Sequence, residues 1–405
     1  MITIAEALAR MMPAFTPRGR EFVPLDEARG RVLASDLLVR EDAPPFDNSA
    51  MDGWAVHAPD VASAAENTPV VLPIAGESRA GGPPPRTLVA GSAMRIFTGA
   101  PLPAGADAVV VQEDSELTGE GVALRFASER YRHVRRKGSD LRKGDVLVTA
   151  GTPIHAGSIA LLASQGIDTV EVVRRPVVAI LSTGDELRDL GEAREAGTIV
   201  NSNAPMLAAL VEEAGAVPLR LPRAPDQLEV VTERLREALD ADLLLTSGGV
   251  SVGDYDVVRE AFTQAGIEMD FWKVAIKPGK PLAFGVHDGT PAVGLPGNPV
   301  SAYVTFQLFV RPGLRRMLGD ARPFPKVHRL VLDGDLQHRP GRTELVRGRW
   351  TERGVAPHGH RGSGSLASIA EAEVLIVLPA EIEHLSAGTE VSVLVLQDRD
   401  ESPPF

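Results

Sequence analysis

Three turns rich in glycine and proline, each next to an apolar run, constrain this chain more than any other feature of its sequence. They span residues 246–256, 277–281 and 294–299. Turns of this kind lie where the strands of an α/β sheet end, and there they present backbone N–H groups, lysines and carboxylates to a phosphorylated ligand. The sequence therefore indicates a chain that handles an anionic small molecule.

Residues 177–310 alternate between short apolar runs and amphipathic stretches. The expected strands are 177–181, 217–221, 243–246 and 292–295, and the expected helices are 205–214, 226–239, 256–265 and 299–310. Asp226 and Asn298 stand where N-caps are expected, and Pro299 stands at the first helical position. Because apolar strands alternate with helices, we expect a doubly wound, mostly parallel sheet that is covered on both faces.

The regions on either side of this alternation have different patterns. Thr3 precedes an amphipathic stretch at residues 4–11, which predicts a capped N-terminal helix. Residues 68–150 hold short apolar runs split by glycine and proline, which is typical of a small β-rich domain. After Pro323 the helical pattern stops. Four strand-like runs follow at 329–332, 344–350, 373–378 and 390–396, so we expect a separate all-β C-terminal domain of about 80 residues.

Composition limits the class of protein. A chain of 405 residues is expected to form two to four domains. Its net charge of −12 argues against nucleic acid as a main partner. It has no cysteine, which excludes disulfides and thiolate metal sites. It has no apolar run of about 18 residues and no signal-peptide pattern, so we expect a cytoplasmic protein that does not bind a membrane.

An anionic ligand of an acidic protein must be bound by a local basic group. Lys273, Lys277 and Lys280 lie within eight residues of one another around Pro278 and Gly279, and they are the candidates. The alternative is that these lysines are solvated, as most lysine runs are.

Three turns that follow expected strands carry candidate phosphate ligands. The Thr246-Ser247-Gly248-Gly249 turn follows a strand, where open α/β sheets bind ligands, although it could also be an ordinary strand-to-helix turn. Thr183-Gly184-Asp185-Glu186 follows the strand at 177–181 in the same way. Its two carboxylates are typical of a Mg²⁺ site beside phosphates, or of acidic residues placed at a helix N-terminus. Pro296-Gly297-Asn298-Pro299 is either an anion-binding helix start or simple helix initiation.

Seven motifs together resemble the molybdopterin molybdenumtransferase family, which includes the E domain of gephyrin. They lie at residues 48–53, 98–103, 138–140, 182–187, 247–251, 277–281 and 295–299, in the order that the family has them. The resemblance implies four parts. These are a helical, dimerising segment at 1–45 with 136–175, a β-rich inserted domain at 46–135, the α/β molybdopterin-binding-like domain at 176–325, and a C-terminal β-barrel domain at 326–405.

The resemblance also implies a reaction. The family takes molybdate and adenylylated molybdopterin as substrates, places the metal on the dithiolene sulfurs, and releases AMP to complete the molybdenum cofactor. It uses Mg²⁺ and works as a homodimer whose site lies between the α/β domain of one chain and the N-terminal part of the other. Molybdopterin adenylyltransferase and molybdoenzyme maturation proteins are the implied partners.

Site residues follow by position from the same resemblance. The catalytic positions are Asp52, Thr98, Asp140, Glu186, Asp226, Asp256, Lys273 and Lys277, with Glu186 and Asp256 also as metal ligands. The turns described above, together with the matched Pro296 and Pro299, give the substrate- and phosphate-binding positions, which are Thr183, Gly184, Asp185, Thr246, Ser247, Gly248, Gly249, Ser251, Lys280, Pro296, Gly297, Asn298 and Pro299. The chain departs from the family pattern twice, because Tyr255 precedes Asp256 instead of following it and Trp54 replaces the commoner tyrosine.

Two other functions compete with this reading. A molybdopterin adenylyltransferase shares the α/β domain and its Gly-Gly turn, but it usually lacks the roughly 170 residues that precede that domain here. A non-catalytic scaffold like gephyrin could tolerate a decayed site, whereas this chain keeps the acids and lysines at the matched positions.

Overall fold

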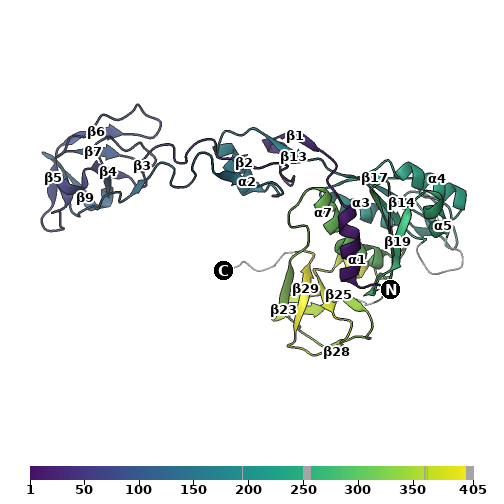
Figure 1. Ribbon diagram of the computed structural model, residues 1–405. Helices are drawn as coiled ribbons and strands as arrows, with labels where there is room; N and C mark the ends of the chain where they lie inside the picture. The colour runs from purple at the N-terminus through teal and green to yellow at the C-terminus, as the bar shows by residue number, and fades with distance from the viewer. Residues whose placement is uncertain (194, 250–256, 360–361, 363, 398–405) are drawn as a thin grey trace. The chain divides into compact units, whose positions relative to one another are not determined.

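The computed structural model describes residues 1–193, 195–249, 257–359, 362 and 364–397. It divides into two compact units (Figure 1), each described below by itself. The α/β–barrel unit comprises Met1–Ser35, Ala150–Ile159 and Thr169–Phe405, and the inserted unit comprises Asp36–Thr149 and Ala160–Asp168. The four-part division expected from the sequence stays a prediction.

A six-stranded sheet with the order β17-β14-β18-β22-β21-β19 forms the centre of the α/β–barrel unit. Its strands are β14 (Val177–Ser182), β17 (Val217–Arg220), β18 (Leu243–Ser247), β19 (Glu268–Lys273), β21 (Pro281–His287) and β22 (Thr290–Leu295). The first four strands of the order pair in parallel, whereas β21 pairs antiparallel with β22 on one side and with β19 on the other. The mostly parallel α/β sheet is therefore confirmed. The antiparallel strands were not predicted, because the polar residues within 268–273 and the lysine segment beside it look like a loop.

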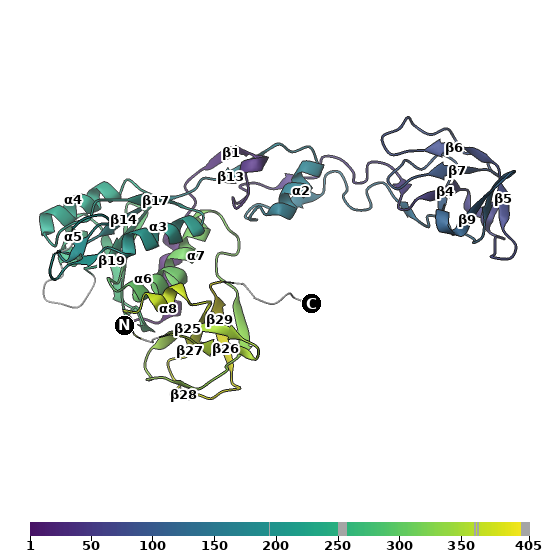
Figure 2. The same ribbon diagram turned by 180° about the vertical axis from the view of Figure 1, so that it is seen from behind.

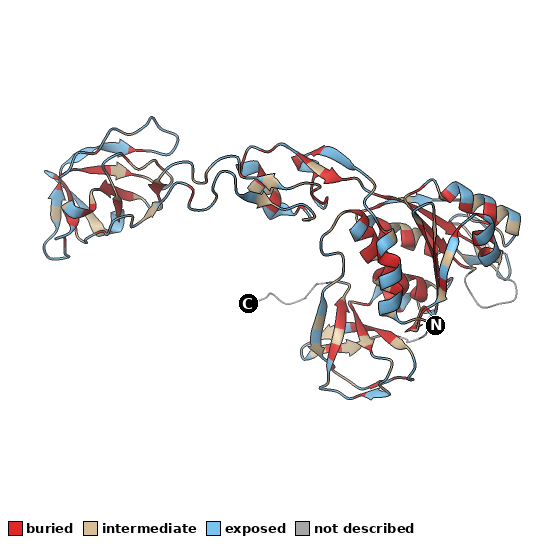
Figure 3. Ribbon diagram, viewed as in Figure 1, coloured by how far each residue is buried: buried red, intermediate tan, exposed pale blue. Residues whose placement is uncertain are grey.

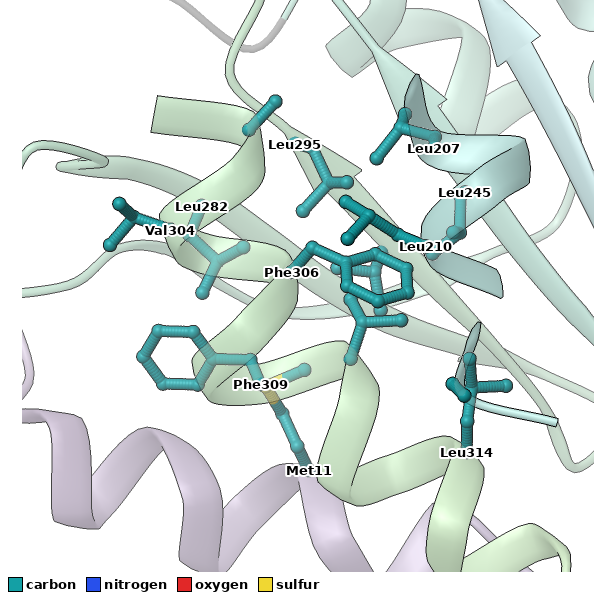
Figure 4. Packing of buried hydrophobic residues seen from close by; sticks show 14 of the residues in the cluster. Met11, Leu207, Leu210, Leu245, Leu282, Leu295, Val304, Phe306, Phe309 and Leu314 are labelled. Carbon is teal, nitrogen blue, oxygen red and sulfur yellow. The ribbon is translucent and has the colours of Figure 1, made fainter. Parts of the chain in front are cut away.

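Helices cover both faces of this sheet. They are α3 (Asn203–Glu213), α4 (Leu228–Ala238), α5 (Val257–Gln264), α6 (Pro299–Thr305) and α7 (Arg311–Met317), with a π-helical turn η5 (Phe306–Val310) between the last two. Alternate residues of β18 point to opposite faces, so Leu243 and Leu245 join one hydrophobic cluster and Leu244 joins the other. Residues of the sheet and of the helices packed on it are accordingly buried (Figure 3). Figure 4 shows Leu245 and Leu295 packed between α3 and the α6–η5–α7 segment.

Two helix starts differ from the sequence prediction. Asp226 does not cap α4, which begins at Leu228 after Gln227, and its backbone N–H donates to Oδ1 of Asp185 at 3.1 Å. Asn298 precedes α6 with the backbone of an N-cap residue, but its side chain makes no capping hydrogen bond. The helix expected at 299–310 changes to a π-helical turn at Phe306 and then continues as α7.

The C-terminal strands close on themselves. The sheet runs β25-β27-β29-β23, with β26 also paired to β25 (Figure 2). A bridge between Leu332 and Val355 joins the two ends. The strands are β23 (Val327–Val331), β25 (Thr343–Thr351), β26 (Gly354–Pro357), β27 (Val374–Leu378) and β29 (Glu390–Val395). Two short strands, β24 (Leu336–Gln337) and β28 (His384–Leu385), pair beside them, and one short helix, α8 (Ala367–Ala370), interrupts the β structure. The interior holds aliphatic side chains such as Val346, Ile376 and Val393, which confirms the predicted barrel.

The N-terminal segment mixes helix and strand. Thr3 and Glu6 form a capping box at the start of α1 (Ile4–Met11), as the sequence predicts. Ala7 and Met11 of α1 lie in the same core as α3 and α7. This part of the chain also has 3₁₀ turns at Met12–Ala14 and Leu25–Glu27, and β1 (Arg20–Pro24) pairs with β13 (Thr169–Val173). Helix α2 (Ala156–Ser164) has residues in both units.

The inserted unit is β-rich, as expected. One sheet has the order β6-β7-β4-β8 and another has the order β5-β10-β9. The strands are β4 (Gly53–Val56), β5 (Val70–Leu72), β6 (Ile74–Ser78), β7 (Ala93–Ile96), β8 (Ala108–Val111), β9 (Ser115–Thr118) and β10 (Gly121–Leu124). Strand pairs β2 (Leu37–Leu38) with β12 (Val146–Val148) and β3 (Asn48–Ser49) with β11 (Val134–Arg135) complete the unit, together with 3₁₀ turns at Ala58–Val61 and Gln112–Asp114. Across the described parts of both units, no helix is long and apolar enough to cross a membrane.

Candidate functional site

A cavity of about 100 Å³ lies at the carboxyl edge of the parallel strands in the α/β–barrel unit. Thr183, after β14, and Ser247, the last residue of β18, line it together with Gly248. Gly297 and Pro299, which follow β22, line another side. Parallel strands end at one edge, so three turns that are far apart in the sequence meet there, as expected of a ligand site in an open α/β sheet.

The backbone at this edge leaves no room for larger side chains. Gly248 has a φ of +102°, and a Cβ there would lie 2.6 Å from the carbonyl oxygen of Thr183. Gly249 has a φ of +64°, and a Cβ there would lie 2.0 Å from Cγ2 of Val258. Backbone hydrogen bonds join the turns, since Thr183 N–H donates to the Ser247 oxygen at 3.1 Å and Gly248 N–H donates to the Leu295 oxygen at 3.3 Å. The glycines thus permit a close approach of main chain that other residues would prevent.

Two asparagines support the cavity from one wall. Nδ2 of Asn203 donates to Oγ of Ser247 at 2.7 Å and to the carbonyl oxygen of Gly297 at 2.8 Å, which ties two of the turns together. Asn201 accepts at Oδ1 from the hydroxyl of Ser182 at 3.3 Å and from the N–H of Ala204 at 3.2 Å. Both asparagines are buried. Neither asparagine was predicted from the sequence, because their partners Ser182, Ser247 and Gly297 lie far away along the chain.

Unpaired polar atoms mark the cavity as a binding surface. Among the described residues, Oγ1 of Thr183, Oγ1 of Thr246 and Oδ1 of Asn203 are buried without a hydrogen-bond partner. Thr183 and Asn203 line the cavity, and Thr246 precedes Ser247 on β18. A buried polar group that lacks a partner costs about 1–3 kcal/mol, so a ligand that supplies partners here gains affinity.

Three carboxylates gather beside the same turn. The Asp185 carboxylate accepts from the N–H of Asp226, Glu186 lines the cavity, and the Glu186 carboxylate lies close to the backbone of Gly184. Partial burial, followed by repulsion from Asp185 and Glu186, raises the pKa of Asp226 above its ordinary value. Carboxylate oxygens at such an edge are the ligand type that Mg²⁺ takes, although the described residues contain no group of three or more His, Asp or Glu arranged to hold a metal ion.

The lysine segment leaves the sheet at this same edge. Strand β19 ends at Lys273, which pairs with Pro281 at the start of β21, and β21 runs antiparallel to β22. Lys280 accepts at its carbonyl oxygen from the N–H of Val274 at 3.0 Å. Lys273 and Lys280 are exposed, whereas Lys277 belongs to a short strand, β20 (Ile276–Lys277), and its ammonium lies 3.2 Å from Oε1 of Glu344. None of the three lysines lines the cavity itself.

Comparison with known proteins finds matches to one protein family along nearly the whole chain. Family models match it over three stretches: the MoeA N-terminal region (domain I and II) at residues 2–166, a probable molybdopterin binding domain at 179–316, and the MoeA C-terminal region (domain IV) at 329–396. A Mycobacterium tuberculosis protein named molybdopterin molybdenumtransferase 2 is 38% identical over 394 residues, which cover 95% of this chain and 96% of that protein. The chain belongs to the molybdopterin molybdenumtransferase family.

Other members of the molybdopterin molybdenumtransferase family agree in length and fold. A Nostoc relative with that name is 39% identical over 388 residues, covering 93% of this chain and 88% of the relative. The crystal structure of a molybdopterin biosynthesis moeA protein from Pyrococcus horikoshii has 30% identity and a TM-score of 0.86, and the match covers 98% of this chain and 100% of that one. The resemblance found in the sequence is therefore confirmed.

The remaining positions matched to the molybdopterin molybdenumtransferase pattern lie elsewhere. In the inserted unit, Oδ1 of Asp52 accepts from Thr98 twice, from its backbone N–H at 2.7 Å and from its hydroxyl at 2.8 Å. These two hydrogen bonds hold the pKa of Asp52 below its ordinary value, and the bond from the backbone N–H contributes more than the bond from the hydroxyl. Asp140 is exposed in the same unit. Ser251, Tyr255 and Asp256 lie outside the described residues, so their predicted roles and the Glu186–Asp256 metal pair stay predictions.

Proposed function

We propose that this chain inserts molybdate into the dithiolene of adenylylated molybdopterin and releases AMP, as a Mg²⁺-dependent transferase of molybdenum cofactor biosynthesis. The single observation that carries the proposal is the cavity formed by Thr183, Ser247, Gly248 and Gly297 at the carboxyl edge of the sheet, in a chain of this family. Its close-packed glycines and unpaired buried oxygens fit a polar, phosphate-bearing ligand.

Charge explains why lysines accompany this cavity. The nucleotide substrate carries several negative charges and molybdate is a dianion. Two unit charges 4 Å apart interact by about 4 kcal/mol at an effective dielectric constant near 20. Lys273, Lys277 and Lys280, which leave the sheet at the same edge, offset part of that repulsion. We assign them to the binding of oxyanions.

Proton transfer gives the carboxylates a role. Molybdate loses an oxo group as water when sulfur replaces it, so protons must reach the departing oxygen. Asp226 is suited to hold such a proton, because burial and its acidic neighbours favour its neutral form. Release of AMP adds water across the bond between the two phosphates, so that one phosphate leaves with the nucleotide.

Glu186, with Asp185 beside it, offers carboxylate oxygens next to a phosphate-binding turn, and these are the ligand type that Mg²⁺ takes. Glu186, which faces the cavity, is the residue that we assign to hold the ion. When bound, Mg²⁺ neutralises charge on phosphate oxygens.

We further propose a homodimer in the cytoplasm, in which Asp52, Thr98 and Asp140 of one copy complete the site of the other. The support is the family pattern together with the Asp52–Thr98 pair, which is ordered by two hydrogen bonds although it lies outside the hydrophobic cores. Molybdopterin adenylyltransferase is the expected supplier of the substrate and molybdoenzyme maturation proteins are the expected recipients of the product.

The decisive experiment mixes the purified chain with adenylylated molybdopterin, Mg²⁺ and molybdate. We expect AMP and metal-loaded cofactor to form together, and AMP release to depend on molybdate. Pyrophosphate formed from ATP and molybdopterin would favour the adenylyltransferase function instead. Stoichiometric capture of a protein partner with no turnover of any of these substrates would favour a scaffold.

A further inference from the structure

The C-terminal barrel joins the lysine segment through two strands that are far apart in the sequence. Strand β20 pairs in parallel with the start of β25, so that Ile276 lies opposite Thr343 and Lys277 lies opposite Glu344. The N–H of Thr343 also donates to the carbonyl oxygen of Ala275 at 3.1 Å. Strand register therefore places a barrel glutamate against a lysine that we assign to oxyanion binding.

The pair is asymmetric in burial. Oε1 of Glu344 lies 3.2 Å from Nζ of Lys277, and the Glu344 side chain is 4% exposed whereas the Lys277 side chain is 43% exposed. A carboxylate that is removed from water must be paired and hydrogen-bonded to remain charged. Glu344 is thus a fixed anchor, and the ammonium that it holds still faces solvent on its other side.

His338 fixes the second oxygen of this carboxylate. Nδ1 of His338 donates to Oε2 of Glu344 at 2.8 Å, the direction that an ionised carboxylate requires. The imidazole is 1% exposed, and its own backbone N–H donates to the carbonyl oxygen of Glu383 at 2.8 Å. Each carboxylate oxygen therefore has a charged or polar partner, and Glu344 has little freedom to turn.

We propose that Glu344, oriented by His338, is a positioning residue for Lys277, so that the barrel sets where the site presents its ammonium to molybdate. This inference rests on the proposed function, which makes Lys277 a ligand of the oxyanion. An ammonium has three N–H donors. One is held by Glu344, and the others remain for a tetrahedral oxyanion on the exposed side. A lysine stem is flexible, so holding it before the ligand arrives improves binding.

The first test compares Glu344→Gln with a matched control, Glu371→Gln. Glu371 is also a barrel glutamate that accepts from a histidine, His358, at 2.7 Å, and it pairs with Arg349 of the barrel at 3.3 Å instead of with a lysine of the 273–280 segment. AMP release is measured against molybdate concentration. We expect Glu344→Gln to raise the KM for molybdate about tenfold while kcat changes less than about twofold, as loss of a ground-state binding contact does. Glu371→Gln leaves both constants unchanged.

The second test measures the reactivity of the Lys277 amine itself and does not require catalytic turnover. The folded chain is treated briefly with acetic anhydride, and acetylation of Lys277 is compared by mass spectrometry with that of exposed Lys273. We expect Lys277 to react several-fold faster in Glu344→Gln, because the amine is no longer held by the carboxylate. His338→Asn is the second variant. It keeps the glutamate charge, loosens its orientation, and produces a smaller rise in the same direction.

The outcomes separate this inference from the proposed function. Unchanged acetylation of Lys277, or faster acetylation with an unchanged KM for molybdate, would overturn the positioning role even if the unaltered chain releases AMP. If the unaltered chain releases no AMP in the presence of molybdate, the proposed function itself fails, whatever the acetylation shows.

Discussion

Single glycines decide the shape of the candidate site. Gly248 needs both a positive φ and the absence of a Cβ, since it contacts main chain rather than a movable side chain. Positive φ alone costs an L residue about 1–2 kcal/mol. A clash with the Thr183 carbonyl comes in addition, because a packed backbone cannot shift freely.

We therefore expect Gly248→Ala to lower the free energy of unfolding of the α/β–barrel unit by about 3 kcal/mol, from positive-φ strain plus overpacking. Urea unfolding followed by tryptophan fluorescence, to which Trp272 and Trp350 of this unit contribute, measures the change. Gly289→Ala is the control, since Gly289 has a φ of +81° with nothing within 4 Å of its would-be Cβ. Equal losses in the two variants would show that the Thr183 contact adds nothing.

Thr98 sets the charge state of Asp52 through two donors of unequal weight. Thr98→Val removes only the hydroxyl, so the pKa of Asp52 should rise but stay below its ordinary value, because the backbone N–H still donates. A folded-state pKa that is depressed stabilises the fold above the unfolded pKa, and that stabilisation is lost as the pH falls through the folded pKa. The variant should therefore lose this stabilisation at a higher pH than the parent. Carbon-13 NMR titration of the Asp52 carboxyl measures the shift, and an unmoved titration would contradict the assignment.

At the level of elements, local signals and packing both act on α1. The Thr3–Glu6 capping box satisfies N–H groups at the helix start, while Met11 packs into the core near Phe309 (Figure 4). The cap defines where the helix begins, and the core determines which face is buried.

Thr3→Ala should cost about 1 kcal/mol of helix stability, because it removes the N-cap acceptor. Native-state hydrogen exchange should then show amides of the first turn of α1 opening about fivefold more often. Thr3→Ser, which keeps the acceptor, is the control and should exchange like the parent. Equal exchange in the alanine variant would mean that tertiary packing alone holds this end of the helix.

At the level of the whole molecule, the proposed dimer divides the site residues between two copies. If Asp52 of one copy serves the site that contains Glu186 of the other, mixed dimers of Asp52→Asn and Glu186→Gln chains keep one complete site. Each variant alone should be nearly inactive, whereas co-expression should restore about a quarter of the parental AMP release, from random pairing in a two-fold symmetric dimer. If each copy formed its own site, the mixture would be as inactive as the single variants.

Much of the site could be predicted because its signals are local. The glycines at 248, 249 and 297, and the acids at 185 and 186, follow apolar strands directly, and strands that alternate with helices must end at one edge. Asn201, Asn203 and Glu344 could not be found in this way. Their roles depend on partners that are distant in the sequence, namely Ser182 for Asn201, Ser247 and Gly297 for Asn203, and Lys277 for Glu344. No local pattern encodes those pairings.

The sequence by itself determined the doubly wound sheet, the glycine turns and the β-barrel, because hydrophobic periodicity and the steric demands of turns act over a few residues. It also determined the family, because seven motifs in the same order are specific for one family. Only the tertiary structure decided that α4 starts after Asp226, that β19 and β21 extend the sheet, and that the barrel holds Lys277 through Glu344. Those outcomes depend on strand register and on burial between segments that lie far apart along the chain. Alternative packings of these segments differ by a few kcal/mol, and that difference selects the observed arrangement. The local preferences of single residues are too weak to do so.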